Sequence, residues 1–274
     1  MIHDHLDGGS DGGSTETLWA HRDRRVPAVA AAHVLTGLPS AMLEQAARIA
    51  FAASAECEAL LSTMDSVIRE LPSELIGYSQ RCIHEVRGPV IWSETVAARG
   101  SSFGDEDVFV CSTVRRSYDC MQNRLLCWIL QRAGLAVGAV QGPMGVRLEP
   151  GERRRIEETA MDARRWRGTP RLRGVTPARP SRREVARLRS ARGSEGAAAV
   201  LLDALARVEQ PFSGPDVVAL ADHDTLVAHE VLLEELTRSG DGFVLGCSDG
   251  SIVSGDVSWR HPANEAVPAE HVWT

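Results

Sequence analysis

The sequence contains no lysine, because all thirty basic residues among its 274 are arginine. Every reaction that needs a side-chain amine is therefore excluded. Schiff-base chemistry, the phosphate-binding lysine of a P-loop and the lysine of most metal-dependent nucleases belong to this group. Arginine can stabilise the charge of a phosphate, but it does not release its proton near neutral pH.

Long hydrophobic runs and paired-cysteine motifs are lacking as well. No apolar run approaches the ~20 residues that cross a bilayer. The first seventeen residues, "MIHDHLDGGSDGGSTET", have neither the basic nor the apolar region of a secretory signal, and they predict a flexible tail over residues 1–17. The six cysteines show no C-x-x-C spacing. We therefore expect reduced, buried thiols and a cytoplasmic protein.

Motifs for catalysis and metal binding are equally scarce. No G-x-S-x-G or P-loop element occurs. The histidines of "HDHLD" (3–7) and "DHDTLVAHE" (222–230), and the pair Cys82 and His84, lack the paired spacing of a zinc site. The sequence therefore predicts neither a metal nor a cofactor.

The charges are distributed very unevenly along the chain. The overall net charge is −7, but residues 147–192 hold fifteen arginines against six acidic residues, a net charge of +9. Residues 195–274 hold three arginines against fourteen acidic residues, a net charge of −11. A basic middle is therefore followed by an acidic end.

The Arg-rich segment, residues 147–192, is the strongest sign of a binding surface. Guanidinium groups suit phosphate, and Trp166 among the arginines offers a ring on which a base can stack. Two other interpretations stay open: pairing with the interleaved acids on solvated helices, and docking on acidic protein surface. The candidate binding residues are Arg153, Arg154, Arg155, Arg164, Arg165, Trp166, Arg167, Arg171, Arg173, Arg182, Arg183 and Arg187.

Hydrophobic periodicity predicts an α+β fold that is mainly helical. It has a small β element in the N-terminal half and a β-hairpin near the C-terminus. Helices are expected over residues 40–71 with a break near Ser54, then 93–100, 117–134, 149–167, 181–192, 196–210 and 215–240. Strands are expected over residues 80–93 and 107–113, with the hairpin turn at 248–250.

The helix expected after residue 117 is apolar except for Asn123 and Arg124. A buried amide or guanidinium persists only when it is hydrogen-bonded or paired. Asn123 could tie the helix to the preceding strand or to the Arg87-Gly88 loop, with Arg124 meeting Glu85 or Asp119. Alternatively, both could face nucleic acid or a partner. We favour the first interpretation, because polar residues in apolar helices are usually satisfied internally.

Two segments together resemble the McrC-type components of restriction systems. They are "EVRGPVIWSETVAARG" and "VFVCSTVRRSYDCMQNRLLCWILQRAG", and the resemblance extends over about residues 40–210. In that family an Arg-Gly-hydrophobic segment precedes an Asp-Thr-x-x-Asn-Arg motif that opens an apolar helix; here Cys120 replaces the threonine. The matching residues are Arg87, Gly88, Trp92, Thr95, Asp119, Asn123 and Arg124. The resemblance implies that they are structural.

The resemblance also implies a domain order. We expect a tail (1–17), an McrC-like α+β module (18–145), a basic helical section (146–193) and an acidic helical segment with the terminal hairpin (194–274). Family members carry a PD-(D/E)xK nuclease domain after such a module. Here Asp256 could take the first acidic position, but no D/E-x-K follows. The nuclease part is therefore expected to be degenerate or truncated.

These observations predict a non-catalytic accessory component of a bacterial anti-phage or restriction-type defence system. The Arg-rich middle would contact DNA, RNA or a protein partner, such as a motor or nuclease subunit of the same system. One alternative is a protein–protein adaptor that binds no nucleic acid. Another is a divergent metal-dependent nuclease that uses Glu235, Asp249 and Asp256 without a lysine.

Overall fold

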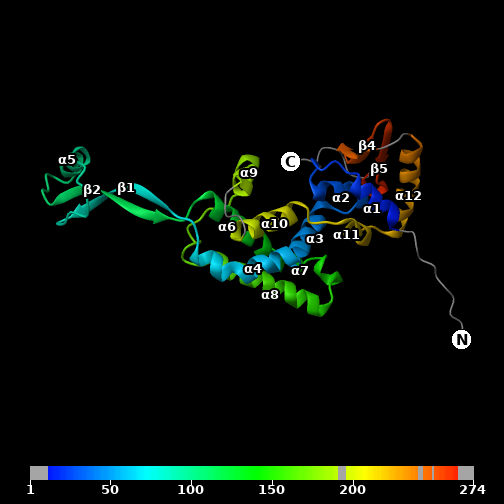
Figure 1. Ribbon diagram of the computed structural model, residues 1–274, viewed down its shortest axis with the longest axis horizontal. Helices are drawn as coiled ribbons and strands as arrows, with labels where there is room; N and C mark the ends of the chain where they lie inside the picture. The colour runs from blue at the N-terminus through cyan, green and yellow to red at the C-terminus, as the bar shows by residue number, and fades with distance from the viewer. Residues whose placement is uncertain (1–11, 191–195, 240–242, 249, 265–274) are drawn as a thin grey trace. The chain divides into compact units, whose positions relative to one another are not determined.

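The computed structural model describes residues 12–190, 196–239, 243–248 and 250–264. Within these residues the fold is α+β and mainly helical, as expected (Figure 1). The chain forms two compact units. Unit 1 comprises residues 1–62, 129–164 and 195–274, and unit 2 comprises residues 63–128 and 165–194. The units therefore interleave along the chain, which differs from the linear domain order expected from the sequence.

Unit 1 is built from helices and a small antiparallel sheet. Its helices are α1 (Gly13–Ala20), α2 (Ala28–Thr36), α3 (Ser40–Ala52), α7 (Ala136–Val140), α10 (Ala197–Glu209), α11 (Gly214–Leu220) and α12 (His223–Arg238). The sheet has the order β3 (Gly246–Ser248), β4 (Ser251–Ser254) and β5 (Val257–Arg260). Helices α4 (Ala55–Arg69), α6 (Met121–Gly134) and α8 (Pro150–Arg167) cross the boundaries between the units.

Several sequence expectations for unit 1 are confirmed and others are wrong. The break near Ser54 separates α3 from α4, and the predicted hairpin is β3–β4, to which β5 adds a third strand. The expected helix over residues 215–240 is two helices, because the side chain of Asp222 accepts a hydrogen bond from Thr225 N and starts α12. Residues 13–17 belong to α1, so the predicted tail ends earlier; residues 1–11 lie outside the described chain.

The interior of unit 1 contains two buried histidines that are held neutral. His229 Nε2 lies 3.0 Å from the carbonyl oxygen of Leu35, which can only accept, so the other ring nitrogen accepts from the Thr15 hydroxyl at 2.8 Å. Burial lowers the pKa of His229 to about 4. His261 accepts a hydrogen bond from Ala263 N and contacts Thr225 Oγ1 at 2.8 Å, and burial also lowers its pKa.

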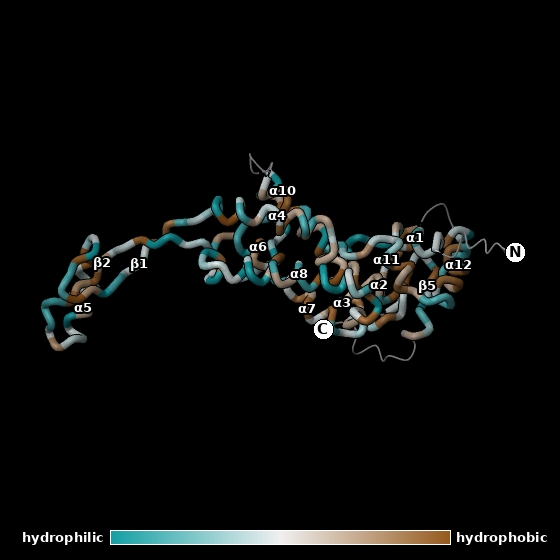
Figure 2. Tube along the Cα trace, turned by 90° about the horizontal axis from the view of Figure 1, so that it is seen from below, coloured by the Kyte–Doolittle hydropathy of each residue, from teal (hydrophilic) through white to brown (hydrophobic). Residues whose placement is uncertain are grey.

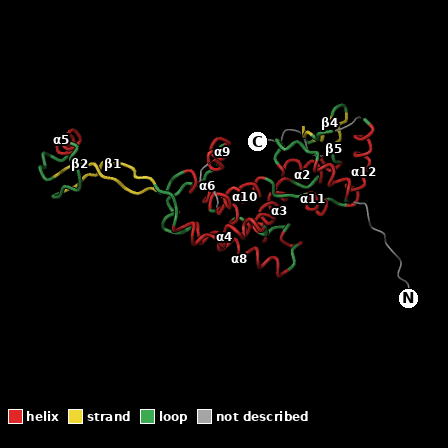
Figure 3. Tube along the Cα trace, in the orientation of Figure 1, coloured by secondary structure: helices red, strands yellow, loops and turns green. Residues whose placement is uncertain are grey.

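Unit 2 contains a long antiparallel hairpin formed by β1 (Glu74–Ile83) and β2 (Val108–Ser117), the two long strands in Figure 3. The short helix α5 (Trp92–Ser101) lies at the end where β1 leads into β2 (Figure 1). Buried Thr95 fixes α5 to the hairpin, because its hydroxyl accepts a hydrogen bond from Val110 N at 2.9 Å. Unit 2 also contains α9 (Arg182–Ser190).

One expectation for this region is wrong. The strand predicted over residues 80–93 begins earlier and ends at Ile83, so Arg87-Gly88-Pro89 lies in a loop. The helix expected over residues 93–100 is α5, which starts after Ile91 without a side-chain cap. None of the helices in the described part of the chain combines the length and the apolar character that spanning a bilayer requires.

Candidate nucleic-acid interface

The Asn123 side chain joins the two ends of the hairpin to α6. Asn123 is fully buried, and its amide nitrogen donates to Pro72 O at 2.9 Å and to Tyr118 O at 2.7 Å. Pro72 precedes β1 and Tyr118 follows β2. The Oδ1 atom of Asn123 is also buried, and no described residue donates a hydrogen bond to it. The structural interpretation of Asn123 therefore holds, but its partners are strand-end carbonyls and not the Arg87-Gly88 loop.

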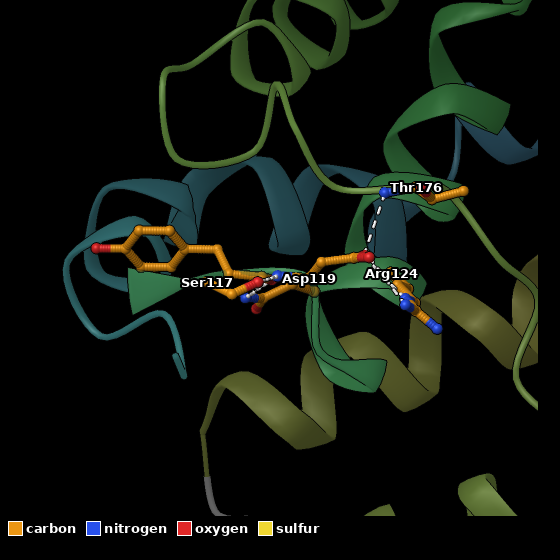
Figure 4. Close-up of polar contacts among 6 residues, drawn as sticks. Ser117, Asp119, Arg124 and Thr176 are labelled. Carbon is orange, nitrogen blue, oxygen red and sulfur yellow. Dashed lines mark hydrogen bonds and ion pairs between the residues drawn. The ribbon is translucent and has the colours of Figure 1, made fainter. Parts of the chain in front are cut away.

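Asp119 and Arg124 form the second part of this anchor (Figure 4). The Arg124 guanidinium donates to both carboxylate oxygens of Asp119, each at 2.8 Å. Asp119 also accepts from Thr176 N at 3.3 Å, and Arg124 O accepts from Ala178 N at 3.3 Å. The hydrogen bonds from Arg124 hold the pKa of Asp119 below its ordinary value. Of the two acids expected for Arg124, Asp119 is the partner; Glu85 pairs with Arg87 instead.

The anchor positions the second half of the Arg-rich segment, residues 165–190, which we call the basic segment. Leu172, Val175 and Leu188 are buried and attach it to unit 2. Turns occupy residues 168–174, and residues 175–180 then lead without regular structure to α9. The segment holds nine arginines and a single acidic residue, Glu184, which gives a net charge of +8.

Glu184 has a local structural role at the start of α9. Its carboxylate accepts hydrogen bonds from the backbone N and the hydroxyl of Ser181, each at 2.7 Å, and Ser181 Oγ accepts from Glu184 N at 3.3 Å. This reciprocal arrangement is a capping box. The bonds from Ser181 lower the pKa of Glu184, so the carboxylate stays charged at the helix N-terminus. The one acid of the basic segment thus caps a helix.

The exposed side of α9 is arginine-rich. With successive residues about 100° apart around a helix, Arg182, Arg183 and Arg187 lie away from buried Leu188. All three are exposed. Among the described residues, neither these arginines nor Arg167 forms an ion pair with a carboxylate. Their charge is therefore available to an external anion.

Three of the predicted binding arginines instead contact backbone carbonyl groups. Arg164 Nε donates to Gly134 O, the last residue of α6, at 2.9 Å. Arg171 Nη1 donates to Ile68 O at 2.5 Å and to Arg69 O at 3.3 Å, at the end of α4. Arg153 Nη2 donates to Gly145 O at 2.6 Å. The last carbonyls of a helix lack intrahelical partners and carry partial negative charge, so Arg164 and Arg171 stabilise helix ends.

The other predicted binding residues also include both arginines with partners inside the protein and exposed arginines. Arg154 forms an i,i+4 ion pair with Glu158 at 3.0 Å, as the alternative of pairing along a solvated helix predicts, and Arg155 is exposed beside it. The Arg165 guanidinium lies 5.5 Å from the ring centroid of half-buried Trp166. Arg173 is exposed and makes a long contact of 3.4 Å with Gly168 O.

Residues 150–164 contain four arginines and four acidic residues, so they carry no net charge. The uniform Arg-rich segment of the sequence is therefore two different regions. The first is electrically balanced and partly structural, whereas the basic segment has a large excess of positive charge. The sequence analysis did not identify Thr176, Ser181 or Glu184 as functional residues. Of these, only the Ser181-x-x-Glu184 spacing could have been recognised, because it is the spacing of a capping box.

Of the remaining residues of the McrC-like pattern, Thr95 is buried, but the other three do not form part of a packed core. Arg87 and Gly88 are exposed in the loop after β1, and the Trp92 side chain is 62% exposed. A structural role is therefore supported for Asp119, Asn123 and Arg124, whereas the exposed Trp92 side chain gives no such support. Its exposure makes it a candidate contact residue.

The acids considered for a metal site are located separately. Asp256 is exposed in the turn between β4 and β5, Glu235 is on α12, and Asp249 lies outside the described residues. The described part of the chain contains no group of three or more His, Cys, Asp or Glu side chains placed to hold a metal.

Burial raises the pKa of the Cys57 thiol to about 12 and that of Cys127 to about 11.

Comparison of this chain with protein-family models, with curated proteins and with solved structures found no match in any of the three.

Proposed function

We propose that this chain is a non-catalytic, cytoplasmic accessory component of a bacterial restriction-type defence system, and that it contacts nucleic acid through the basic segment. The defence role rests on the McrC-like order of residues around Asp119, Asn123 and Arg124. The binding role rests on the basic segment itself. The proposed partners are DNA or RNA, together with a motor or nuclease subunit of the same system.

The observation that carries the binding proposal is the surplus of positive charge in the basic segment, where exposed Arg182, Arg183 and Arg187 form no ion pair with a described carboxylate. The basic segment holds nine arginines against one acid, and that acid is engaged in the cap of α9. Guanidinium forks bind phosphate oxygens, and neutralising phosphates releases condensed counterions. Half-buried Trp166, with Arg165 beside it, adds a surface on which an unpaired base could stack.

Fluorescence anisotropy tests this proposal with purified full-length chain and labelled duplex DNA, single-stranded DNA and RNA of equal length. If about six phosphates are contacted, affinity falls roughly 10³-fold between about 50 and 200 mM salt. Absence of binding to all three probes at the lowest salt, or an affinity independent of salt, contradicts the proposal.

The absence of catalysis is a separate part of the proposal. We expect no Mg²⁺- or Mn²⁺-dependent cleavage of plasmid, linear or methylated DNA by the isolated chain. Cleavage that disappears in Asp256→Ala, in a preparation free of contaminating nuclease, would restore the nuclease alternative. The Asp256→Ala protein should first be shown to unfold at the same temperature as the parent.

A protein–protein adaptor remains the second candidate, and the end of the hairpin in unit 2 favours it. The Phe103 side chain is fully exposed, and Trp92 and Val96 are 62% and 67% exposed on α5. Asp105, Glu106 and Asp107 follow Phe103, and this acidic surface would repel phosphate. A neighbouring gene for a motor or a complete nuclease would supply the partner to test. Co-purification with that protein, but with no nuclease-sensitive material, would favour the adaptor.

A further inference from the structure

The side chains in the first half of β1 are exposed on both faces of the strand. Leu75 is 71% exposed, Ile76 and Tyr78 are each 40% exposed, and Val114 on the neighbouring strand is 64% exposed. Figure 2 shows hydrophobic positions along this hairpin. A two-stranded ribbon is marginally stable in water by itself, because it buries little apolar surface. Additional pairing would therefore stabilise it.

The backbone bonds of β2 show which groups of β1 point outward. Val110 and Ser112 direct their backbone groups away from β1, since Val110 O accepts from Ile91 N at 2.8 Å and Ser112 N donates to Pro89 O at 2.7 Å. In an antiparallel pair, residues with outward-pointing groups lie opposite one another. Val110, Ser112, Val114 and Arg116 pair with Arg81, Ser79, Gly77 and Leu75. The N–H and C=O groups of these four β1 residues therefore form an open edge.

The part of this edge that precedes Arg81 carries none of the features that prevent pairing between identical strands. Residues 75–80, "LIGYSQ", include no charge and no proline, and the register from Glu74 to Ile83 is continuous, without a bulge. The outer edge of β2 differs, because residues 89–91 cover part of it and Arg115 and Arg116 follow. Natural proteins use charge, proline, bulges and covering segments to block edge pairing. Only β2 is protected in this way.

We propose that β1 is a self-association edge, on which the β1 strand of a second copy pairs antiparallel across a two-fold axis at Tyr78. This register uses all four outward residues, with Gly77 opposite Ser79 of the second copy and Leu75 opposite Arg81 of the second copy. Two hairpins then form one four-stranded sheet. The exposed side chains of Leu75, Ile76 and Tyr78 gain neighbours on both faces.

The charges of β1 favour the second copy as the occupant of this edge. Glu74 lies at the start of the strand and Arg81 near its end, with no charged residue between them. Antiparallel pairing brings the Glu74 end of each strand to the Arg81 end of the other. Such a two-fold interface is self-complementary and closed, so the expected product is a dimer and not a fibre.

Sedimentation velocity on the full chain, from low to high micromolar concentration, tests the proposal. The decisive variant is Gly77→Pro, which replaces an outward N–H with the proline ring and removes no hydrogen bond between β1 and β2. Gly77→Ala is the matched control, because a Cβ at this position meets no atom within 4 Å. We expect a reversible dimer for the parent and for Gly77→Ala, and a monomer for Gly77→Pro.

Three outcomes of sedimentation overturn the proposal: a parent chain that is monomeric at every concentration, a dimer that survives Gly77→Pro, and open-ended assembly beyond a dimer. A monomeric parent that binds the strand of a different protein at β1 belongs to the first outcome. Far-UV circular dichroism and thermal unfolding of Gly77→Pro show whether the hairpin itself is retained.

Disulfide trapping provides a second measurement that does not depend on proline. Tyr78 would face Tyr78 of the second copy as a non-hydrogen-bonded pair, whose Cα separation of about 4.5 Å suits a disulfide. With oxidised glutathione, Tyr78→Cys should give a covalent dimer. Val114→Cys, which is more exposed than Tyr78 but lies on β2, and the parent with its native cysteines should not. Equal trapping of Tyr78→Cys and Val114→Cys, or trapping of neither, contradicts the proposed register.

Discussion

The two units differ in both the sign of their charge and the chemistry of their buried polar groups. Unit 1 has thirteen arginines and twenty-seven acidic residues, a net charge of −14, whereas unit 2 has seventeen and ten, a net charge of +7. Neutral histidines bonded to threonines occupy the interior of unit 1. An amide and an Asp–Arg pair organise unit 2. If the proposed function is correct, nucleic-acid contact is therefore expected on unit 2, while the effect of pH is expected mainly on unit 1.

The largest expected effect compares arginines of the two units directly. The triple variant Arg182→Gln, Arg183→Gln, Arg187→Gln in unit 2 should lower nucleic-acid affinity about 100-fold and reduce the salt slope by about three. The double variant Arg154→Gln, Arg155→Gln in unit 1 should change affinity by no more than about twofold, because α8 is electrically balanced there. Equal losses in the two variants, measured by anisotropy, would remove the distinction between the units.

Acidification should destabilise unit 1 selectively. Burial lowers the pKa of His229 to about 4, so the folded state resists protonation that the unfolded chain accepts near pH 6.5. The stabilisation is complete above pH 6.5 and is lost as pH falls, by up to about 3 kcal/mol at pH 4. In unit 2, Asp119 has a lowered pKa and stays ionised in this window.

Hydrogen exchange at pH 7 and pH 5 measures this difference between the units. The amides of α12 should lose protection at pH 5 relative to those at the start of α6, after correction for the intrinsic exchange rate. His261 contributes in the same direction, since burial lowers its pKa as well. Uniform loss of protection in both units would contradict the assignment of the pH response to unit 1.

Truncation of Asn123 tests the anchor within unit 2. Asn123→Ala leaves the carbonyl groups of Pro72 and Tyr118 without their donor, which should cost about 2 kcal/mol of unfolding free energy. Gln122→Ala, on the preceding and partly exposed position, is the matched control. Denaturant unfolding measures both values. A change within about 0.5 kcal/mol for Asn123→Ala would show that the anchor does not stabilise the unit.

The smallest expected effect separates two neighbouring arginines of the basic segment. Arg171→Ala should lower stability by about 1 kcal/mol, because Arg171 donates to the last carbonyls of α4. Arg173→Ala should stay within about 0.5 kcal/mol, because among the described residues its side chain makes only a long hydrogen bond to Gly168 O. Thermal unfolding of the two proteins makes the comparison, and equal losses would exclude a helix-end role for Arg171.

The sequence predicted the local features of the fold well. Periodicity located α3, α4 and α6, and the desolvation cost of Asn123 and Arg124 correctly predicted internal partners, with Asp119 among them. The bonds to Pro72 O and Thr176 N could not be predicted, because backbone groups distant in the chain leave no pattern around Asn123. For the same reason the helix-end roles of Arg164 and Arg171 were hidden. The exposure of Trp92 could not be predicted either, because its pattern match carried no information on burial.

The two hydrogen bonds of Asn123 also imply that the hairpin is a modular insertion. The amide nitrogen of Asn123 donates to Pro72 O, just before β1, and to Tyr118 O, just after β2. The two ends of the hairpin are therefore close together. A short turn could span them. Evolution can thus lengthen, shorten or exchange residues 73–117 while the rest of unit 2 keeps its shape. The segment can therefore diversify its contacts independently of the fold that carries it.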